Sequence, residues 1–370
     1  MASGEFPVID QGQEFITGYC DDSEKLIDFE LPLIIFGDHT RCFKYVDFPF
    51  VLGADGTKVL KPNKKLFDPK FYYFALQSLD LPNRGYNRHF KMLKERNLPL
   101  PPLPEQKKIA HILSTVQRAI EAQERIIQTT TELKKALMHK LFTEGLRNEP
   151  QKQTEIGPVP ESWEVAPLGD IGQIERGKFS HRPRNEPRFY GGNYPFVQTS
   201  DVSNCDGYVR SYSQTLNEEG LAISKMFPTG TILITIAANI GFTGILQFDS
   251  ACPDSLIGIS PSKLIQTEFL NYYLITQQPK MDQLAPKGTQ KNINIQFLRP
   301  WLIPLPDREE QEKISEVLIA ADNKIRIASV KRHGLQDLFR TLLHQLMTAK
   351  TRVRNLDFQP NLNEKQTSWI

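Results

Sequence analysis

Apolar side chains recur at helical spacing in two long stretches of the chain. In each stretch, four apolar positions follow one another at steps of four, three and four residues. That spacing places them on one narrow stripe of a helix, as in helices that pair as a coiled coil. The two sets are Ile109, Leu113, Val116 and Ile120, and Ile314, Leu318, Ala321 and Ile325. The pattern therefore predicts two long helices that pair with each other.

The two helical stretches are copies of one internal repeat with an offset of 205 residues. LPLPPLPEQKKIAHILSTVQRAI begins at Leu98 and aligns with IPLPDREEQEKISEVLIAADNKI, which begins at Ile303. The alignment continues from LKKALMHKLFT into LFRTLLHQLMT. The shared leucines are Leu133, Leu137 and Leu141 in the first copy, and Leu338, Leu342 and Leu346 in the second. Residues 105–143 of the first copy would form a helix of about 58 Å.

A region typical of mixed strands and short helices precedes each predicted helix. These regions are rich in Ile, Val, Phe, Tyr and Thr, with Gly and Pro breaks. They match each other loosely: FPVIDQGQEFITGY from Phe6 is similar to YPFVQTSDVSNCDGYV from Tyr194, and FYYFAL from Phe71 to FLNYYL from Phe269. The charge-free stretch 226–248 contains Pro and Gly breaks, so it predicts buried strands joined by a glycine turn and not a membrane span.

Composition places the chain among ordinary soluble proteins. Its 370 residues carry 45 Lys+Arg and 43 Asp+Glu, a formal net charge of +2, so any site for a polyanion must come from local clustering. The four cysteines form no CxxC pair, which argues against a zinc ribbon or a disulfide scaffold. The first residues lack the basic start and apolar core of a signal peptide, and we expect a cytoplasmic protein.

Motifs for catalysis or metal binding are incomplete. GQIERGKF at 172–179 fits seven positions of a phosphate-binding loop, but Phe179 stands where Ser or Thr must hold magnesium. Acidic side chains in PDREEQEK at 306–313 are explained by the positive end of a helix dipole. The seven histidines lack metal-ligand spacing, and we find neither Asn-Pro-Pro-aromatic nor FxGxG, motifs for S-adenosylmethionine binding and base methylation. We expect no catalytic residue, no metal and no cofactor.

Basic side chains cluster in both globular regions. RGYNRHFKMLKER at 84–96 has five basic residues and one acidic residue, and RGKFSHRPRNEPR at 176–188 has five basic residues close to Glu175 and Glu186. Arg and Lys mixed with Asn, His and aromatic residues suit phosphate anchoring and the reading of base edges. A solvated surface loop would show the same composition, so charge alone leaves both interpretations open.

With these motifs together, the chain resembles the specificity subunit of type I restriction-modification systems over nearly its whole length. The resemblance rests on PLPPLPEQKKI and PLPDREEQEKI, each followed by a long helix ending in Leu-x-x-x-Leu-x-x-x-Leu. SWEVAPLGDIGQIERG from Ser162 and GTQKNI from Gly288 add to it. The resemblance implies an α+β fold: two globular mixed α/β target recognition domains, separated by two long antiparallel coiled-coil helices in a pseudo-twofold internal repeat.

The resemblance also implies a division of labour. Each recognition domain would read one half of a split site in double-stranded DNA, and the helices would set the spacer and dock two modification subunits. Those subunits would hold S-adenosylmethionine and methylate the DNA, and restriction subunits would complete the system. This chain would be non-catalytic. The rival hypothesis is a non-catalytic coiled-coil adaptor that binds protein partners.

The expected segments are a first target recognition domain at 1–104, a spacer helix at 105–146, a linker at 147–160, a second recognition domain at 161–306, a second spacer helix at 307–350 and a tail at 351–370. The first domain looks shortened at its N-terminus, because the second has about 30 residues ahead of its YPF segment. Ser368 and Trp369 lie about one repeat offset after Ser162 and Trp163, which raises the conjecture that the tail completes the first domain.

Two sets of residues are candidates for these roles. The candidate DNA-binding residues are Arg84, Asn87, Arg88, Lys91, Arg176, Lys178, Arg182, Arg184, Arg188, Lys287, Gln290, Lys291 and Asn292. The candidate coiled-coil and partner-docking residues are Ile109, Leu113, Val116, Ile120, Leu133, Leu137, Leu141, Ile314, Leu318, Ile325, Leu338, Leu342 and Leu346.

Overall fold

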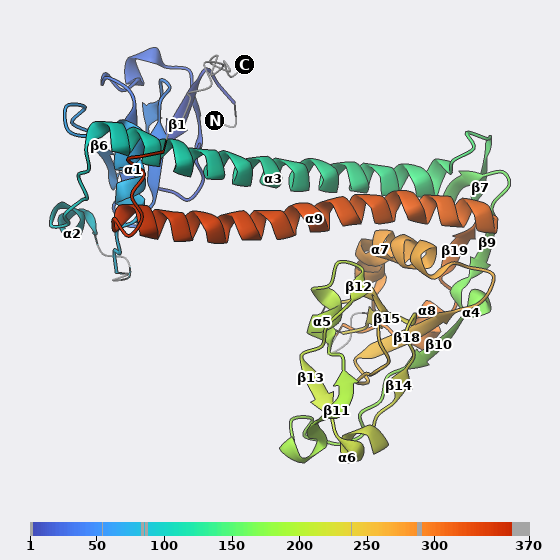
Figure 1. The fold of residues 1–370 in the computed structure, drawn as a ribbon. Helices are drawn as coiled ribbons and strands as arrows, with labels where there is room; N and C mark the ends of the chain where they lie inside the picture. Colours follow the sequence, from blue (N-terminus) through green and yellow to red (C-terminus); the bar gives the residue numbers. More distant parts are fainter. Residues whose placement is uncertain are drawn as a thin grey trace. The chain divides into compact units, whose positions relative to one another are not determined.

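The computed structural model describes residues 3–53, 55–82, 85, 88–237, 239–286 and 291–356. The chain divides into two compact units: unit 1 comprises Met1–Arg125 with Ser329–Ile370, and unit 2 comprises Ile126–Ala328. Each unit combines a region of strands and short helices with one half of each long helix (Figure 1).

The two predicted long helices are present as α3 (Leu103–Glu144) and α9 (Arg308–Met347). In unit 1, the start of α3 shares a hydrophobic core with the end of α9, through Leu113 and Leu346. In unit 2, the end of α3 shares a core with the start of α9, through Leu141 and Ile314. Since opposite ends of the helices meet in each unit, the pairing is antiparallel.

Unit 1 contains two small sheets. One has the order β2-β1-β5 and the other β4-β3-β6. Their strands are β1 (Phe6–Ile9), β2 (Gly18–Cys20), β3 (Leu33–Gly37), β4 (Phe43–Val46), β5 (Val51–Leu52) and β6 (Thr57–Leu60). The helices are η1 (Ser23–Lys25), α1 (Pro69–Gln77) and α2 (Phe90–Lys94). α1 starts where Asp68 accepts hydrogen bonds from two backbone N–H groups ahead of Pro69, a favourable cap.

Unit 2 holds larger sheets with the orders β10-β18-β15-β16-β12 and β13-β11-β17-β14, and the pairs β19-β9 and β7-β8. The strands are β7 (Gln151–Thr154), β8 (Gly157–Pro160), β9 (Glu164–Pro167), β10 (Gly172–Arg176), β11 (Tyr190–Phe196), β12 (Tyr208–Val209), β13 (Gln214–Leu216), β14 (Met226–Phe227), β15 (Ile232–Thr235), β16 (Thr243–Leu246), β17 (Ser250–Ala251), β18 (Leu256–Pro261) and β19 (Leu302–Leu305). The helices are α4 (Leu168–Ile171), η2 (Pro187–Phe189), α5 (Thr199–Ser203), α6 (Glu218–Ala222), α7 (Thr267–Leu284) and α8 (Ile295–Leu298).

The charge-free stretch 226–248 forms β14, β15 and β16, and the last two strands are buried. Gly230 and Gly241 adopt positive φ values of 87° and 82° in the turns, a conformation that glycine adopts readily. The prediction of buried strands with a glycine turn is confirmed. Within the described ranges, no helix combines the length and apolar character that crossing a membrane requires.

The two units share a core of equivalent strands. In unit 1, β3 lies between β4 and β6, and β1 pairs in parallel with β5. In unit 2, β15 lies between β16 and β18, and β11 pairs in parallel with β17. The matching sequences from Phe6 and Tyr194 thus begin in equivalent strands, β1 and β11, but their ends differ, because β2 pairs with β1 whereas β12 pairs with β16. β18 also pairs with β10, whereas β6 has no equivalent second partner among the described residues.

The stretch predicted as a linker at 147–160 contains the hairpin of β7 and β8. Gly157 takes a φ of +106° at the turn, and Val159 is buried in the core of unit 2. Its polar composition predicted a linker, but Val159 and Pro160 at the end of β8 are both buried. The segment therefore belongs to unit 2.

Candidate nucleic-acid interface and helix junctions

The Glu-Gln pair that opens each long helix anchors the helix to its globular region. In unit 1, Gln106 donates from Nε2 to the carbonyl oxygens of Leu66 and Pro101, both at 2.8 Å. Its Oε1 accepts from the backbone N of Asp68 at 2.8 Å. Because Gln106 is fully buried, losing these bonds would leave buried polar groups unsatisfied. The side chain fixes the start of α3 to the start of α1.

Unit 2 repeats this junction. Gln311 donates to the carbonyl oxygens of Leu264 at 3.1 Å and Pro306 at 2.9 Å, and accepts from the backbone N of Gln266 at 2.7 Å. Gln266 is the residue before α7, as Asp68 is the residue before α1. The repeated glutamine therefore makes the same three contacts in both units.

The glutamate of each pair binds the segment that follows the other long helix. In unit 1, Glu105 accepts two hydrogen bonds from Arg352, both at 2.7 Å, and one from Arg354 at 3.2 Å. In unit 2, Glu310 accepts from the backbone N of Leu146 at 2.8 Å and from Nε1 of Trp163 at 3.2 Å.

These segments are also equivalent by the repeat. Arg147 lies 3.6 Å from Glu310, and the 205-residue offset places Arg147 on Arg352. In each unit, the glutamate at the start of one long helix thus binds residues that follow the C-terminal end of the other long helix. Ser368 and Trp369, for which we conjectured an equivalent of Trp163, lie outside the described residues.

Glu105→Gln is expected to weaken unit 1 near neutral pH by about 1 to 2 kcal/mol, since bonds to charged groups are strong but these arginines are partly exposed. Hydrogen bonds from Arg352 lower the pKa of Glu105 from about 4.5 to about 2. A lowered folded-state pKa stabilises the fold above the unfolded value, and this contribution disappears as the pH falls from 4.5 towards 2.

Urea unfolding at pH 7, 4 and 2.5 would measure the difference between the wild-type chain and Glu105→Gln. The difference should shrink steadily as the pH falls. Glu124→Gln, at an exposed position of α3, is the control and should leave stability unchanged at all three pH values. A pH-independent difference for Glu105→Gln would show that the ion pair contributes nothing.

The basic candidates of unit 1 are only partly described. Arg84 and Asn87 lie outside the described residues, while Arg88 and Lys91 are exposed before and within α2. Lys94 of the same helix lies 5.2 Å from the ring of Phe90. The structure places Arg88 and Lys91 where a polyanion can reach them.

Three basic candidates of unit 2 converge on one residue, Asp254, two of them on its carboxylate and one on its backbone oxygen. Arg182 donates to Oδ2 of Asp254 at 2.8 Å, Arg184 donates to Oδ1, and Nε of Arg176 donates to the backbone oxygen at 2.7 Å. All three arginines are exposed. Asp254 lies 70 residues from Arg184 and outside every basic run, so sequence reasoning missed it.

The remaining candidates of unit 2 that the structure describes make no hydrogen bond or ion pair with Asp254. Arg188 pairs with Glu186 at 2.8 Å, and the Lys178 side chain is exposed. Lys291 pairs with Asp282 at 2.8 Å, and Asn292, also exposed, forms a bridge with Ala237. Lys287 and Gln290 lie outside the described residues.

The helix candidates separate into three groups by burial. Those buried between the helices and the globular regions are Ile109, Leu113, Leu141, Ile314, Leu318 and Leu346. Those half-buried are Val116, Ile120, Leu137, Ile325 and Leu342. Leu133 and Leu338 are instead 55% and 45% exposed. These two leucines occupy equivalent repeat positions and do not contribute to a buried seam.

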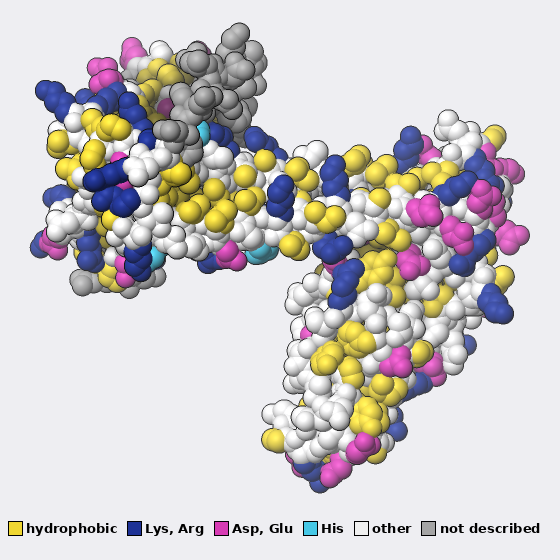
Figure 2. All heavy atoms as spheres, in the orientation of Figure 1, with side chains coloured by type: hydrophobic (Ala, Val, Ile, Leu, Met, Phe, Trp, Pro, Cys, Tyr) yellow, Lys and Arg dark blue, Asp and Glu magenta, His cyan; other side chains and the backbone are white. Residues whose placement is uncertain are grey.

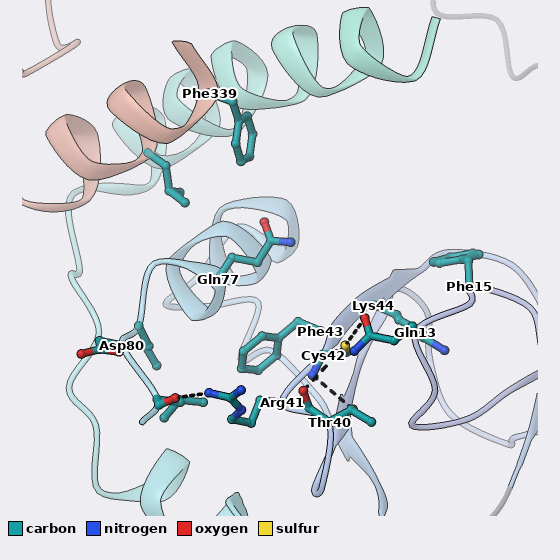
Figure 3. A pocket seen from close by; sticks show the side chains of 13 residues that line it. Gln13, Phe15, Thr40, Arg41, Cys42, Phe43, Lys44, Gln77, Asp80 and Phe339 are labelled. Atoms are coloured by element: carbon teal, nitrogen blue, oxygen red, sulfur yellow. Dashed lines mark hydrogen bonds between the residues drawn. The ribbon is translucent and has the colours of Figure 1, made fainter. Parts of the chain in front are cut away.

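Figure 2 shows acidic and basic side chains interspersed over the visible face of each unit, with hydrophobic side chains gathered along α3 and α9. A groove of about 690 Å³ lies in unit 1 between β4, α1 and the end of α9, beside Gln13, Arg41 and Phe339 (Figure 3). Across the residues that the structure describes, no three His, Cys, Asp or Glu side chains gather as a metal site would require.

The geometry defines a class of protein: two globular regions with equivalent core strands, each with exposed basic residues and each joined by a Glu-Gln junction to a pair of antiparallel helices. The family model of the type I restriction modification DNA specificity domain matches residues 2–131 and again residues 160–336. The chain belongs to this family, and its role is DNA recognition. The assignment from the repeated motifs is confirmed.

Relatives from several organisms share this organisation. A specificity subunit assigned to the type I restriction enzyme MjaX of Methanocaldococcus jannaschii is 30% identical over 82% of this chain and 73% of that protein. The MjaVIII specificity subunit of the same organism is 31% identical over 72% of this chain and 65% of that protein. The EcoR124I/EcoR124II specificity subunit of Escherichia coli is 23% identical over 84% of this chain and 78% of that protein.

Two solved structures share the fold. The type I restriction-modification S subunit from M. genitalium aligns with a TM-score of 0.64 at 18% identity, over 94% of this chain and 90% of that chain. A chain from a structural study of type I complex assembly aligns with a TM-score of 0.52 at 18% identity, over 92% of this chain and 91% of that chain. These likenesses support the α+β fold with two long helices.

Proposed function

We propose that unit 1 and unit 2 each read one half of a bipartite DNA site, and that α3 and α9 set the distance between the halves. One observation carries this proposal. The strand topology and the Glu-Gln junctions are repeated, while the exposed basic segments differ in sequence. Two domains that read different bases need the same framework but different surface side chains. The reason is that bases are distinguished by the side chains that enter the groove and not by the fold.

The chain itself would be non-catalytic. Methylation would come from two modification subunits that hold S-adenosylmethionine and dock on the long helices, and restriction subunits would join the same complex. The exposed Leu133 and Leu338 support docking at two sites, because the repeat keeps an apolar side chain at equivalent exposed positions.

The test is to express the chain with its modification subunit and map the methylated positions of the host DNA by sequencing. We expect one motif of two short defined blocks around an unspecified spacer of fixed length. Binding of that motif should weaken steeply with salt, since each neutralised phosphate adds about 0.9 to the logarithmic slope. Binding that is indifferent to DNA sequence and salt would favour the coiled-coil adaptor instead.

A further inference from the structure

Arg184 is held at both ends, although its side chain is 42% exposed. Its guanidinium Nη2 donates to Oδ1 of Asp254, and its backbone oxygen accepts from the hydroxyl of Tyr190. Most exposed arginines sample many rotamers, so fixation of both the backbone and the head is a specific feature of this residue. The direction of its guanidinium is therefore set before any ligand binds.

The support for Arg184 is itself anchored. Arg182 donates to the other oxygen of Asp254 and also to the carbonyl oxygens of Phe179 and His181, at 2.6 Å and 2.8 Å. Phe179 is buried, with its ring centroid 5.3 Å from that of Phe196. An aromatic core thus holds Arg182, Arg182 holds Asp254, and Asp254 holds Arg184.

Asp254 occupies one edge of the Arg184 guanidinium. A guanidinium carries five N–H donors in a rigid planar fork, and one carboxylate oxygen leaves most of them available. Within the part of the chain that the structure describes, the Arg184 head has no other hydrogen-bond partner. A free edge of a fixed fork fits two neighbouring acceptors in one plane, such as O6 and N7 of guanine in the major groove.

We propose that Arg184 reads a guanine in the half-site bound by unit 2, and that Asp254 is the positioning residue that aims it. The proposal rests on the proposed bipartite DNA recognition. A phosphate carries a full negative charge, so a carboxylate beside the arginine would oppose a contact with it. A base contact requires direction, which the chain from Phe179 to Arg184 supplies.

The experiment uses the full chain in complex with its modification subunits, with Asp254→Asn and Arg184→Lys as variants. Both should lose preference for guanine at the same single position of the site, by about 5- to 150-fold, the range for one bidentate contact. Asp254→Asn should bind unrelated DNA as well as the wild type or better, because it removes a negative charge. Arg184→Lys keeps the charge and loses only the fork.

Asp249→Asn is the matched control. Asp249 lies in the same unit and accepts from the backbone and hydroxyl of Thr229, with no hydrogen bond or ion pair to an arginine among the described residues, so the Asn variant should leave the sequence preference unchanged. Thermal unfolding of each complex would show whether the variants remain folded, and Arg184→Lys tests the proposal even if Asp254→Asn unfolds.

Two results separate the proposals. In the first, Arg184→Lys leaves every base preference intact, while Arg184→Ala weakens binding to all DNA sequences equally and lowers the salt slope by about one. Arg184 then contacts phosphate, and the inference is wrong. If the wild-type complex methylates no bipartite motif, the proposed function itself fails. Unchanged preference in both Asp254→Asn and Arg184→Lys would also overturn the positioning role.

Discussion

The double variant Leu133→Asp with Leu338→Asp is expected to abolish assembly with the modification subunits and therefore methylation. Each leucine is exposed, and Ile126, seven residues before Leu133, is exposed on the same face of its helix. An interface that covers such a side chain would have to bury an unpaired carboxylate in the variant, which costs several kcal/mol. We expect affinity to fall at least 100-fold at each site.

The single variants distinguish one docking site from two. Leu133→Asp and Leu338→Asp should each assemble with one modification subunit instead of two, as measured by mass photometry or analytical ultracentrifugation. Thr131→Asp is the control, because Thr131 is exposed and lies about 200° around the helix from Leu133. Retention of two modification subunits by the double variant would place docking elsewhere on the chain.

These leucines also show what hydrophobic spacing can and cannot predict. The repeat predicted both long helices to within a few residues, because a long apolar stripe that recurs at one fixed offset leaves few alternatives. The same pattern gave Leu133 and Leu338 as coiled-coil or partner-docking residues without separating the two roles, and both are exposed. One helix can carry a buried stripe and an exposed apolar position, and spacing alone does not tell which face meets solvent.

The globular regions were predictable in kind but not in detail. The loose likeness of FYYFAL to FLNYYL corresponds to α1 and α7, whose rings Phe74 and Phe269 each pack on a long helix, 5.9 Å from Phe339 and 5.2 Å from Phe142. Strand order was not predictable, because β3 and β15 each pair with partners that long connections separate in sequence.

The candidate interface, too, was only partly predictable from the sequence. The basic run around Arg184 was visible in the sequence, since charge clusters locally. Asp254 was not, because its function depends on β10 and β18 being neighbours in one sheet. Its position in a short connection between β17 and β18 gives no local signal. A site whose parts meet only through sheet pairing requires the structure.

Matched insertions of four residues in both long helices, after Arg125 and before Ser329, are expected to lengthen the unspecified spacer of the recognised site. Four helical residues add about 6 Å and rotate the following chain by about 400°, or 40° beyond a full turn. Adding one to two base pairs to DNA adds about 3 to 7 Å and rotates the groove by about 34° to 69°. Translation and rotation thus change in the same sense in protein and DNA.

Insertion in both helices preserves their antiparallel register, and a four-residue step is one that paired helices accommodate by local unwinding. Sequencing of methylated DNA should then show the same two blocks of bases with a spacer one to two base pairs longer. A four-residue insertion between Glu155 and Ile156, in the turn of the β7-β8 hairpin, is the control and should leave the spacer unchanged. If the variant instead methylates the original spacing, or the bases in either block change, α3 and α9 do not set the spacer and serve only to dock partners.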